Sequence, residues 1–544
     1  MSGRCRVQAR FVAESRKYSI YFERFGWSLG DQNFELPPGS RGPKTTAWTM
    51  LFGASKSTQP RKYRPRRANV SVYETMKSRL KWDTLLAEKR LRELLGGSKS
   101  TKVAGESRSE YERDRDRTVY SSPVRRLIRK TQVFPLDPSD FIRTRLMHSV
   151  EVSTVAEGLT TQAVRDVIKN REKLSQEQLE AISKVAETCG LLHDLGNPPF
   201  GHAGELAIAS WFECTENGRK TIADLGGAKR QKAQDFLKFE GNAQTLRIVT
   251  NTHLLSHSYG LNLTCAAISA VRKYVAPSHK ADKDSKWHEM KKPGYFVSEE
   301  KLLEKVSKLT GTEGCRHPIT FLVEAADDIV YSVVDLEDSV KKGLLRSGDL
   351  IEELMQRCGG SSVLKETLER TDKQMENAPK TLEPSEYPQA FRVNAISAMV
   401  RAVVEVFDRH YDEIMNGSYH DELIYDKDCR ASSFVNACKE LLRDRVFCND
   451  EVLRLELRGR QVIHDLMKLF WEGAETYLKD RKTHTKTYGG KLYLLISGNY
   501  RELFEQRLKA GEDQVYCAVQ LVTDYIAGMT DGFACKLHQD LMNG

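Results

Sequence analysis

The sequence predicts an all-α protein with at most one small β-hairpin. From about residue 76 onward, apolar residues recur at intervals of three and four, which is the period of an amphipathic helix with one buried face. Alternating runs of the β type are few and short, and LYLLIS at 492–497 is the best of them. With 544 residues, of which 40% are apolar, the chain is long enough to bury a large core.

The first 75 residues differ from the rest in composition and charge. They mix Gly, Ser, Pro and Arg without sustained periodicity, so we expect a basic, poorly ordered extension. They hold 14 Lys and Arg against 5 Asp and Glu, a balance of +9 that equals the net charge of the whole chain. Two interpretations stay open for this segment, an idle unstructured extension and a basic arm that contacts nucleic acid.

The clearest predicted helix ends in LLHDLGNPPFGH at 191–202. Its apolar positions form one stripe, made of Leu179, Ile182, Val185, Ala186, Cys189 and Leu192. The helix breaks at the glycine, asparagine and two prolines of 196–199, directly after His193 and Asp194. The same spacing predicts helices over 141–159, 317–341, 388–415, 450–478 and 513–542. The polar, lysine-rich segments 216–235 and 276–295 are predicted to be surface loops.

Composition also excludes several classes of protein. No stretch approaches the ~18 uncharged apolar residues that a membrane span needs, and the N-terminus lacks the apolar core of a signal peptide. We therefore expect a cytoplasmic protein without a membrane partner. The 11 cysteines are scattered and never spaced as C-x-x-C, so neither a disulfide framework nor a thiolate zinc site is expected.

Four side chains are suited to a divalent metal ion. His193 and Asp194 stand at a helix end, where two adjacent residues, normally ~100° apart, can both approach one ion. His148 lies on an earlier predicted helix, and Asp327 lies among Ala, Ile and Val, where an unpaired carboxylate would be costly. This nitrogen and oxygen set suits Mn²⁺ or Mg²⁺, with Fe²⁺, Co²⁺ and Zn²⁺ not excluded.

Further polar residues accompany these four. In GHAGE, His202 and Glu205 are three apart where a new helix begins, so the carboxylate can orient the imidazole for general acid or base chemistry. Arg145 lies three residues before His148 and faces the same way. Tyr331 and Asp335 continue a polar stripe that begins at Asp327. The neighbouring acidic residues 337 and 338 are expected on an exposed face.

The order of these residues, H…HD…D, resembles the HD-domain metal-dependent phosphohydrolases. From about residue 76 to 542 the chain further resembles the deoxyguanosine triphosphate triphosphohydrolase (dGTPase) family. The segments that carry the resemblance are RSEYERDRDRTVYSSPVRRLIRKTQVFPLD (108–137), RTRLMHS (143–149), LLHDLGNPPFGHAGE (191–205), FEGNAQTLRI (239–248), GLNLT (260–264), RKY (272–274), EAADDIVYSVVDLED (324–338) and DYIAGMTD (524–531).

The resemblance implies a fold and a reaction. The fold is an HD-domain helical bundle with additional C-terminal helices. Residues 76–544 would form it, with an HD core at about 108–345 and a C-terminal helical part at about 346–544. The reaction is hydrolysis of a deoxynucleoside triphosphate, with dGTP preferred, to the deoxynucleoside and tripolyphosphate. His148, His193, Asp194 and Asp327 would hold the metal ion.

The resemblance also implies roles for other residues. His202, oriented by Glu205, would protonate the leaving 5′-oxygen. Arg145, Lys273 and Tyr274 would contact the phosphates of the substrate. Gln132, Tyr331 and Asp335 would surround its sugar. Asn197 and Asn242 would be two further pocket residues.

Partners and alternatives follow from the same resemblance. Family members assemble into hexamers or tetramers, so a homo-oligomer is expected, and some bind single-stranded DNA. Two alternative functions stay open at this stage. One is another HD-domain nucleotide phosphohydrolase, which would leave KTQVF, FEGNAQ and DYIAGMTD without a role. The other is a nucleic-acid-binding regulatory HD protein. The balance of charges in residues 76–544 is neutral, which argues against this function because nucleic-acid binding depends on positive charge.

Overall fold

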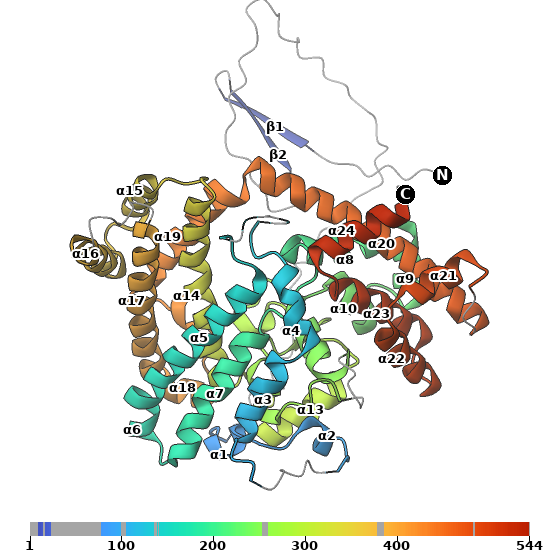
Figure 1. Ribbon diagram of the computed structural model, residues 1–544, viewed down its shortest axis with the longest axis horizontal. Helices are drawn as coiled ribbons and strands as arrows, with labels where there is room; N and C mark the ends of the chain where they lie inside the picture. The colour runs from blue at the N-terminus through green and yellow to red at the C-terminus, as the bar shows by residue number, and fades with distance from the viewer. Residues whose placement is uncertain are drawn as a thin grey trace, which may run out of the picture. The chain divides into compact units, whose positions relative to one another are not determined.

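Helices make up nearly all of the regular structure, as the sequence predicts (Figure 1). The computed structural model describes residues 78–542 except for 99–104, 135, 137–138, 140, 253–258, 378–385 and 482–484, together with two strands near the N-terminus. The chain divides into two compact units, Met1–Asn69 and Val70–Gly544.

The described part of the first unit is a pair of antiparallel strands. Strands β1 (Ala9–Glu14) and β2 (Lys17–Phe22) pair along their whole length, with Ala9 opposite Phe22. The sequence did not predict this pair. The rest of residues 1–75 lies outside the described residues, so the expected disorder of the extension stays a prediction.

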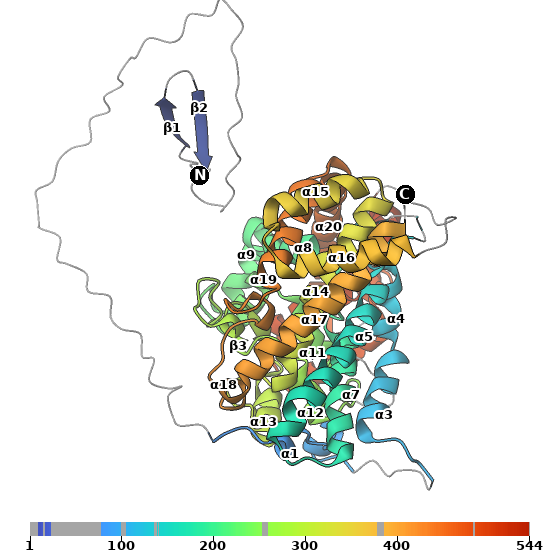
Figure 2. The ribbon, with the colours of Figure 1, turned by 90° about the vertical axis from the view of Figure 1, so that its left-hand side faces the viewer.

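Four long helices form the centre of the second unit. Helix α5 packs against α7, α14 and α17, and α14 also packs against α7 and α17. Figures 1 and 2 show the four side by side. Their apolar faces meet in one core that includes Ile182, Ile329, Val333 and Phe407. The four helices are α5 (Arg145–Ala163), α7 (Gln176–Leu192), α14 (Pro318–Lys341) and α17 (Tyr387–Arg409).

Local sequence sets where three of these helices begin. The Thr144 side chain caps α5, and Ser175 forms a capping box with Gln178 at the start of α7. Helix α14 starts with a proline in its first turn, after the His317 side chain accepts a hydrogen bond from a backbone N–H. These starts place His148 in the first turn of α5, residue 193 at the end of α7 and residue 327 within α14.

A second core lies around α20, the longest helix. Helix α20 packs against α8, α21, α23 and α24, and α22 packs against α23. Large aromatic side chains fill this core, among them Trp211, Phe470 and Tyr525. The helices are α8 (Gly201–Cys214), α20 (Asp450–Asp480), α21 (Tyr488–Leu495), α22 (Gly498–Lys509), α23 (Gln514–Ala527) and α24 (Asp531–Met542).

Shorter elements complete the second unit. A third, smaller core includes Leu91, Leu127, Ile268 and Leu303. The shorter helices are α1 (Trp82–Leu85), α2 (Leu91–Leu94), α3 (Glu110–Val119), α4 (Ser122–Arg126), α6 (Lys169–Arg171), α9 (Glu216–Asp224), α10 (Gln231–Leu237), α11 (Gly241–Arg247), α12 (Cys265–Ala270), α13 (Glu300–Thr310), α15 (Ser347–Cys358), α16 (Ser362–Glu376), α18 (Tyr411–Met415) and α19 (Ser432–Leu442). Single π or 3-10 turns lie at Leu127–Arg129, Val164–Ile168, Ile248–Thr252, His288–Met290, Leu423–Tyr425 and Arg443–Phe447.

The prediction of surface loops at 216–235 and 276–295 is wrong in large part. Helices α9 and α10 occupy most of the first segment, because Thr215 caps α9 and Ile222 and Phe236 are buried anchors among the polar residues. The second segment is largely irregular, but it contains β3 (Ala276–Pro277) and β4 (Pro293–Tyr295), a short parallel pair.

The β interpretation of LYLLIS is also wrong. Its first four residues end α21, whose N-terminus is capped by the Thr487 side chain. Leu492 and Tyr493 are buried, and α21 packs closely on α20. Packing against a long neighbouring helix therefore outweighs the local β preference.

Glu337 and Asp338 are buried, so their expected place on an exposed face is wrong. Arg143 lies before α5 and bonds to both carboxylates, 3.0 Å from Glu337 in one case. Arg392 of α17 also pairs with Glu337, at 2.5 Å. A buried carboxylate is tolerated when paired in this way.

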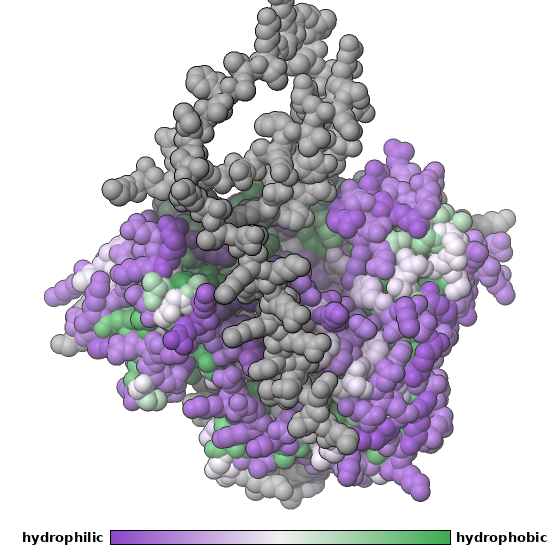
Figure 3. All heavy atoms as spheres, turned by 180° about the vertical axis from the view of Figure 1, so that it is seen from behind, coloured by the Kyte–Doolittle hydropathy of each residue, from purple (hydrophilic) through white to green (hydrophobic). Residues whose placement is uncertain are grey.

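The surface carries mostly polar residues. The face of the molecule in Figure 3 is dominated by hydrophilic side chains, and the apolar ones gather in small separate patches. Within the described residues, each helix is too short or too polar to cross a lipid bilayer. The predicted cytoplasmic location and the predicted boundary at about residue 345 stay predictions.

Candidate active site

Three of the four predicted metal ligands meet at one point in the bundle. His148 comes from α5, His193 from the end of α7 and Asp327 from the middle of α14. Their ligand atoms all lie within 4.8 Å of one another. The Asp327 Oδ1 atom lies 3.1 Å from His148 Nε2 and 3.5 Å from His193 Nε2. Residues up to 179 positions apart in the sequence therefore form one cluster.

The fourth predicted ligand, Asp194, lies beside this cluster. Its Oδ2 atom is 3.6 Å from His193 Nε2 and 4.0 Å from His148 Nε2. The Arg145 guanidinium bonds to the same oxygen, and the Asn197 side-chain amide donates to Oδ1. Arg145 and Asn197 thus hold the carboxylate in place.

A backbone carbonyl orients the His193 ring. The ring Nδ1 donates to the Gly190 carbonyl at 2.7 Å, which leaves Nε2 as the acceptor nitrogen that faces the cluster. His193 Nε2 is buried and makes no hydrogen bond. An imidazole fixed through its Nδ1, with an unsatisfied Nε2 beside carboxylates, is the usual arrangement of a metal-ligating histidine.

The charges of the cluster also fit a cation. Burial raises the pKa of Asp194, but Arg145 and the two histidines lower it to about 2. Burial likewise raises the pKa of Asp327, and the same histidines hold it well below its usual range. Burial lowers the pKa of His193, but the two carboxylates raise it to about 9. Ionised carboxylates that attract a proton to a buried imidazole would attract a divalent ion in its place.

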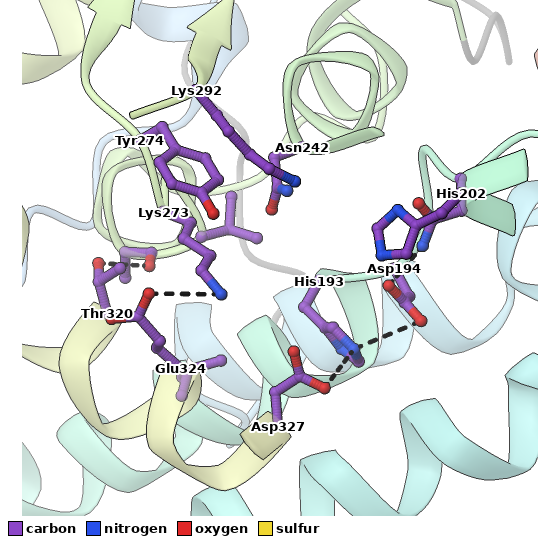
Figure 4. A pocket seen from close by; sticks show the side chains of 14 residues that line it. His193, Asp194, His202, Asn242, Lys273, Tyr274, Lys292, Thr320, Glu324 and Asp327 are labelled. Carbon is purple, nitrogen blue, oxygen red and sulfur yellow. Dashed lines mark hydrogen bonds and ion pairs between the residues drawn. The ribbon is translucent and has the colours of Figure 1, made fainter. Parts of the chain in front are cut away.

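His193, Asp194 and Asp327 of this cluster form one wall of a cavity. Figure 4 shows them on one side of this cavity and two lysines on another. A hollow with several convergent polar and charged groups suits a small-molecule ligand. The lining residues are His193, Asp194, Asn197, His202, Asn242, Ala270, Val271, Lys273, Tyr274, Lys292, Thr320, Val323, Glu324 and Asp327.

His202 and Glu205 form the pair that the sequence predicts. The His202 Nδ1 atom lies 2.7 Å from Glu205 Oε2, in the first turn of α8. The other oxygen of Glu205 accepts the Gly241 N–H at 2.7 Å, so the buried carboxylate is itself fixed. The His202 side chain is 80% exposed, and its bond to Glu205 raises its pKa. This arrangement favours a protonated imidazole, oriented by Glu205, at the cavity.

Two lysines give the opposite wall a positive charge. Lys273 Nζ lies 3.3 Å from Glu324, and Lys292 Nζ lies 3.2 Å from Glu240. Both ammonium groups lie within 6 Å of the Tyr274 ring centre, at 5.8 and 5.9 Å. A wall of this kind suits an anionic ligand.

The amino-acid sequence was compared with those of known proteins and with protein-family models. The family model described as phosphohydrolase-associated domain matches residues 492–540. A deoxyguanosinetriphosphate triphosphohydrolase-like protein of Listeria monocytogenes is 36% identical over 471 residues, covering 85% of this chain and 99% of the relative. A deoxyguanosinetriphosphate triphosphohydrolase of Klebsiella pneumoniae is 31% identical over 478 residues, covering 79% of this chain and 93% of the relative. The chain belongs to the deoxyguanosinetriphosphate triphosphohydrolase family.

Four substrate residues predicted from the likeness to this triphosphohydrolase family do not line the cavity, namely Gln132, Arg145, Tyr331 and Asp335, although Arg145 bonds to Asp194, which does. Tyr331 lies one turn beyond Asp327 on α14, with its ring near Phe447 and the Lys439 ammonium. Asp335 is buried, burial raises its pKa well above the usual range, and its Oδ2 makes no hydrogen bond. Gln132 also has a buried Oε1 without a partner. Their predicted contacts with a sugar stay predictions.

Two charged residues that line the cavity were missed in the sequence. Glu324 stands three positions before Asp327 on α14, and this i, i+3 spacing of carboxylates was a usable signal. Lys292 lies in the segment taken for a surface loop, next to β4, and no local pattern separates it from the neighbouring lysines. Both residues contribute charge to the cavity wall that faces the cluster of His193 and Asp327.

Proposed function

We propose that the protein hydrolyses deoxynucleoside triphosphates to a deoxynucleoside and tripolyphosphate, with dGTP preferred. One observation carries the proposal. A cluster of two histidines and two carboxylates faces a lysine-lined cavity with an oriented imidazole at its edge. The names of the relatives, which specify deoxyguanosine triphosphate, support both the reaction and the preferred base.

His148, His193, Asp194 and Asp327 would hold a divalent ion. Their nitrogen and oxygen donors, without sulfur, suit Mn²⁺ or Mg²⁺, and the unsatisfied Nε2 of His193 fits a ligand role. When bound, such an ion supplies Lewis-acid polarisation of a phosphate oxygen.

Cationic residues would bind the triphosphate. Lys273 and Lys292 line the cavity, and each is paired with a carboxylate that a phosphate group would replace. Arg145 at Asp194 adds a guanidinium close to the reacting phosphorus. The Tyr274 hydroxyl and the Asn242 amide offer further hydrogen bonds to phosphate oxygens.

His202 would act as the general acid. A water oxygen attacks the α-phosphorus, the bond from this phosphorus to the 5′-oxygen breaks, and His202 gives its proton to the leaving oxygen. The bond to Glu205 raises the pKa of His202 and so favours its protonated form, whose charge Glu205 stabilises. The products are then a neutral deoxynucleoside and tripolyphosphate.

The sugar would contact Tyr331 and Asp335, which follow Asp327 along α14, and Gln132, which lies in the segment before α5. Gln132 and Asp335 carry buried polar atoms without a partner, and Tyr331 offers an aromatic face. A close fit at the 2′-carbon would exclude ribonucleotides, because an added hydroxyl would be buried without a partner.

The test is a product assay. The purified protein is incubated with Mn²⁺ or Mg²⁺ and each of the four dNTPs in turn, and the products are separated by ion-exchange chromatography. Equal amounts of deoxynucleoside and tripolyphosphate, formed fastest from dGTP, support the proposal. Release of orthophosphate or of a nucleoside monophosphate refutes it and points to another HD-domain phosphohydrolase. A homo-oligomer and binding of single-stranded DNA stay predictions from the family resemblance.

A further inference from the structure

The Asp531 carboxylate, in the first turn of α24, joins two separate segments of the active site. Its Oδ2 atom accepts the Thr131 N–H at 2.8 Å and also bonds to the Thr131 hydroxyl. Its Oδ1 atom accepts the Phe200 N–H at 3.0 Å. Asp531 is 2% exposed, so these bonds are shielded from water.

Each of these partners adjoins a functional residue. Phe200 lies two positions before His202, the proposed general acid. The Thr131 carbonyl accepts a hydrogen bond from Arg145 Nε at 3.1 Å, and Arg145 in turn holds Asp194. A single carboxylate from the C-terminal helix is therefore bonded to the backbone that leads to both residues.

The backbone at Phe200 needs such support. Phe200 has φ 63° and ψ 19°, the left-handed conformation, which is unfavourable for a non-glycine residue. The next residue, Gly201, also has a positive φ of 56°. Together the two residues turn the chain from the proline break into α8 and so fix where the first turn of α8, including His202, begins.

The Phe200 ring is held from its other side by α20. The ring is 5% exposed and packs in the second core. A Cβ atom added at Gly459 would lie 2.6 Å from the Phe200 Cγ atom, so only glycine leaves room for the ring there. Helix α20 and Asp531 thus hold Phe200 between them.

Lys130 makes a second connection between the same elements. Its buried ammonium donates to the Asn197 carbonyl at 2.5 Å and to the Ala527 carbonyl at 2.7 Å. Asn197 holds the Asp194 carboxylate, and Ala527 is the last residue of α23. The C-terminal helices therefore contact the turn after the metal ligands at two points, its start at Asn197 and its end at Phe200.

We propose that Asp531 and Lys130 are positioning residues, through which the C-terminal helices fix His202 and Asp194 in their reactive geometry. The inference rests on the proposed function of this site. It assigns a catalytic purpose to residues 492–540, which match the phosphohydrolase-associated domain. Neither residue lines the cavity, and each bonds to backbone groups of the segments that carry the site residues.

The experiment compares Asp531→Asn with a matched control, Asp426→Asn. Asp426 is also a buried carboxylate. It accepts one backbone N–H, from Asp428, and one hydroxyl, from Tyr419, and it lies 3.4 Å from His410 Nε2, but it contacts neither segment. We expect Asp531→Asn to lower kcat by about tenfold to a hundredfold, as small misplacements of reacting groups do, with little change in KM or Mn²⁺ affinity. Asp426→Asn should keep the wild-type kcat, even where its loss of melting temperature is similar.

Two further variants separate positioning from loss of stability. Gly459→Ala displaces the Phe200 ring without removing a hydrogen bond. Alanine favours a helix more than glycine does, so the substitution does not weaken α20 through helix propensity. A fall in kcat would therefore come from the displaced Phe200 ring. In a His202→Ala background, Gly459→Ala should cost less than about threefold in kcat, because the group that it positions is absent. Asp531→Asn should cost less there than in the wild type, because only its effect through Arg145 and Asp194 remains.

Each outcome decides between distinct claims. A wild-type kcat in Asp531→Asn, an equal fall in Asp426→Asn, or full additivity with His202→Ala would overturn the positioning role. If Asp531→Asn does not fold, Gly459→Ala and its combination with His202→Ala decide the question. A wild-type protein that releases no tripolyphosphate would instead refute the proposed function, and the two failures are therefore distinguishable.

Discussion

Replacing Gly190 with alanine should separate the two helices that carry the histidine ligands. A Cβ atom at Gly190 would lie 2.5 Å from the Ser153 Cα atom and 2.8 Å from the Ser153 nitrogen. Carbon atoms in contact lie about 3.5–4.0 Å apart, so α5 and α7 must move apart by about 1 Å. Backbone atoms cannot rotate away as a side-chain end can, so the helices themselves have to shift.

The shift should weaken both the fold and the metal site. Overpacking of this kind costs about 1–3 kcal/mol of stability. His148 moves with α5 and His193 with α7, and the Gly190 carbonyl that orients His193 moves as well. Metal–ligand distances tolerate only about 0.2 Å, so we expect Mn²⁺ affinity to fall by about tenfold to a hundredfold.

Calorimetry provides the assay and α5 provides a control. Mn²⁺ binding to metal-free protein is measured by titration calorimetry, and the melting temperature by scanning calorimetry. Gly158→Ala, on the exposed side of α5, has no atom within 4 Å of its added Cβ and should leave Mn²⁺ affinity unchanged while stabilising the helix. Wild-type Mn²⁺ affinity in Gly190→Ala, or an equal loss in Gly158→Ala, would refute the reasoning.

Three other predictions follow from the site and its surroundings. His193→Ala should abolish both Mn²⁺ binding and turnover, whereas His202→Ala should bind Mn²⁺ normally and lower kcat by about 10²–10⁴-fold. Titration calorimetry measures the Mn²⁺ binding, and a rate assay measures the turnover. Normal turnover in His202→Ala would remove His202 from the mechanism. Lys273→Met and Lys292→Met should each raise the KM for dGTP and reduce its dependence on salt, measured between low and high ionic strength; an unchanged KM would contradict a phosphate contact. Burial raises the pKa of Asp235 from its ordinary 3.8 to about 7, so the folded state gains about 4 kcal/mol of stability below pH 4 and loses it as the pH rises towards 7. The free energy of unfolding, measured with urea across this range, should depend less on pH in Asp235→Asn than in the wild type. The same pH dependence in both proteins would contradict the shift.

Local patterns in the sequence predicted much of the fold and the residues that cluster around His193 and Asp327. The i, i+3, i+4 spacing in 317–341 correctly placed a helix, and the apolar neighbours of Asp327 marked it as a carboxylate on a mostly buried helix, where it is half-buried. The break after His193 correctly marked a helix end, where α7 stops at Leu192. These features are local, because a helix start, a helix stop and a buried face each depend on a few neighbouring residues.

Features that depend on distant partners were not predictable in this way. Glu337 resembles an exposed acid until Arg143, 194 positions away, is placed beside it. The start of LYLLIS becomes helical through its contact with α20, and Lys292 reaches the cavity only because its loop folds over Tyr274. The two bonds from Asp531 span 331 and 400 positions, and no sequence pattern links their ends. Such contacts are set by tertiary packing and not by local propensity.

Hydrolysis of dGTP in water enriched in ¹⁸O tests the central claim most directly. If the residues around His193 and Asp327 direct water to the α-phosphorus, mass spectrometry should find one ¹⁸O atom in the tripolyphosphate and none in the deoxyguanosine. Label in the deoxyguanosine, or labelled orthophosphate in place of tripolyphosphate, would contradict it.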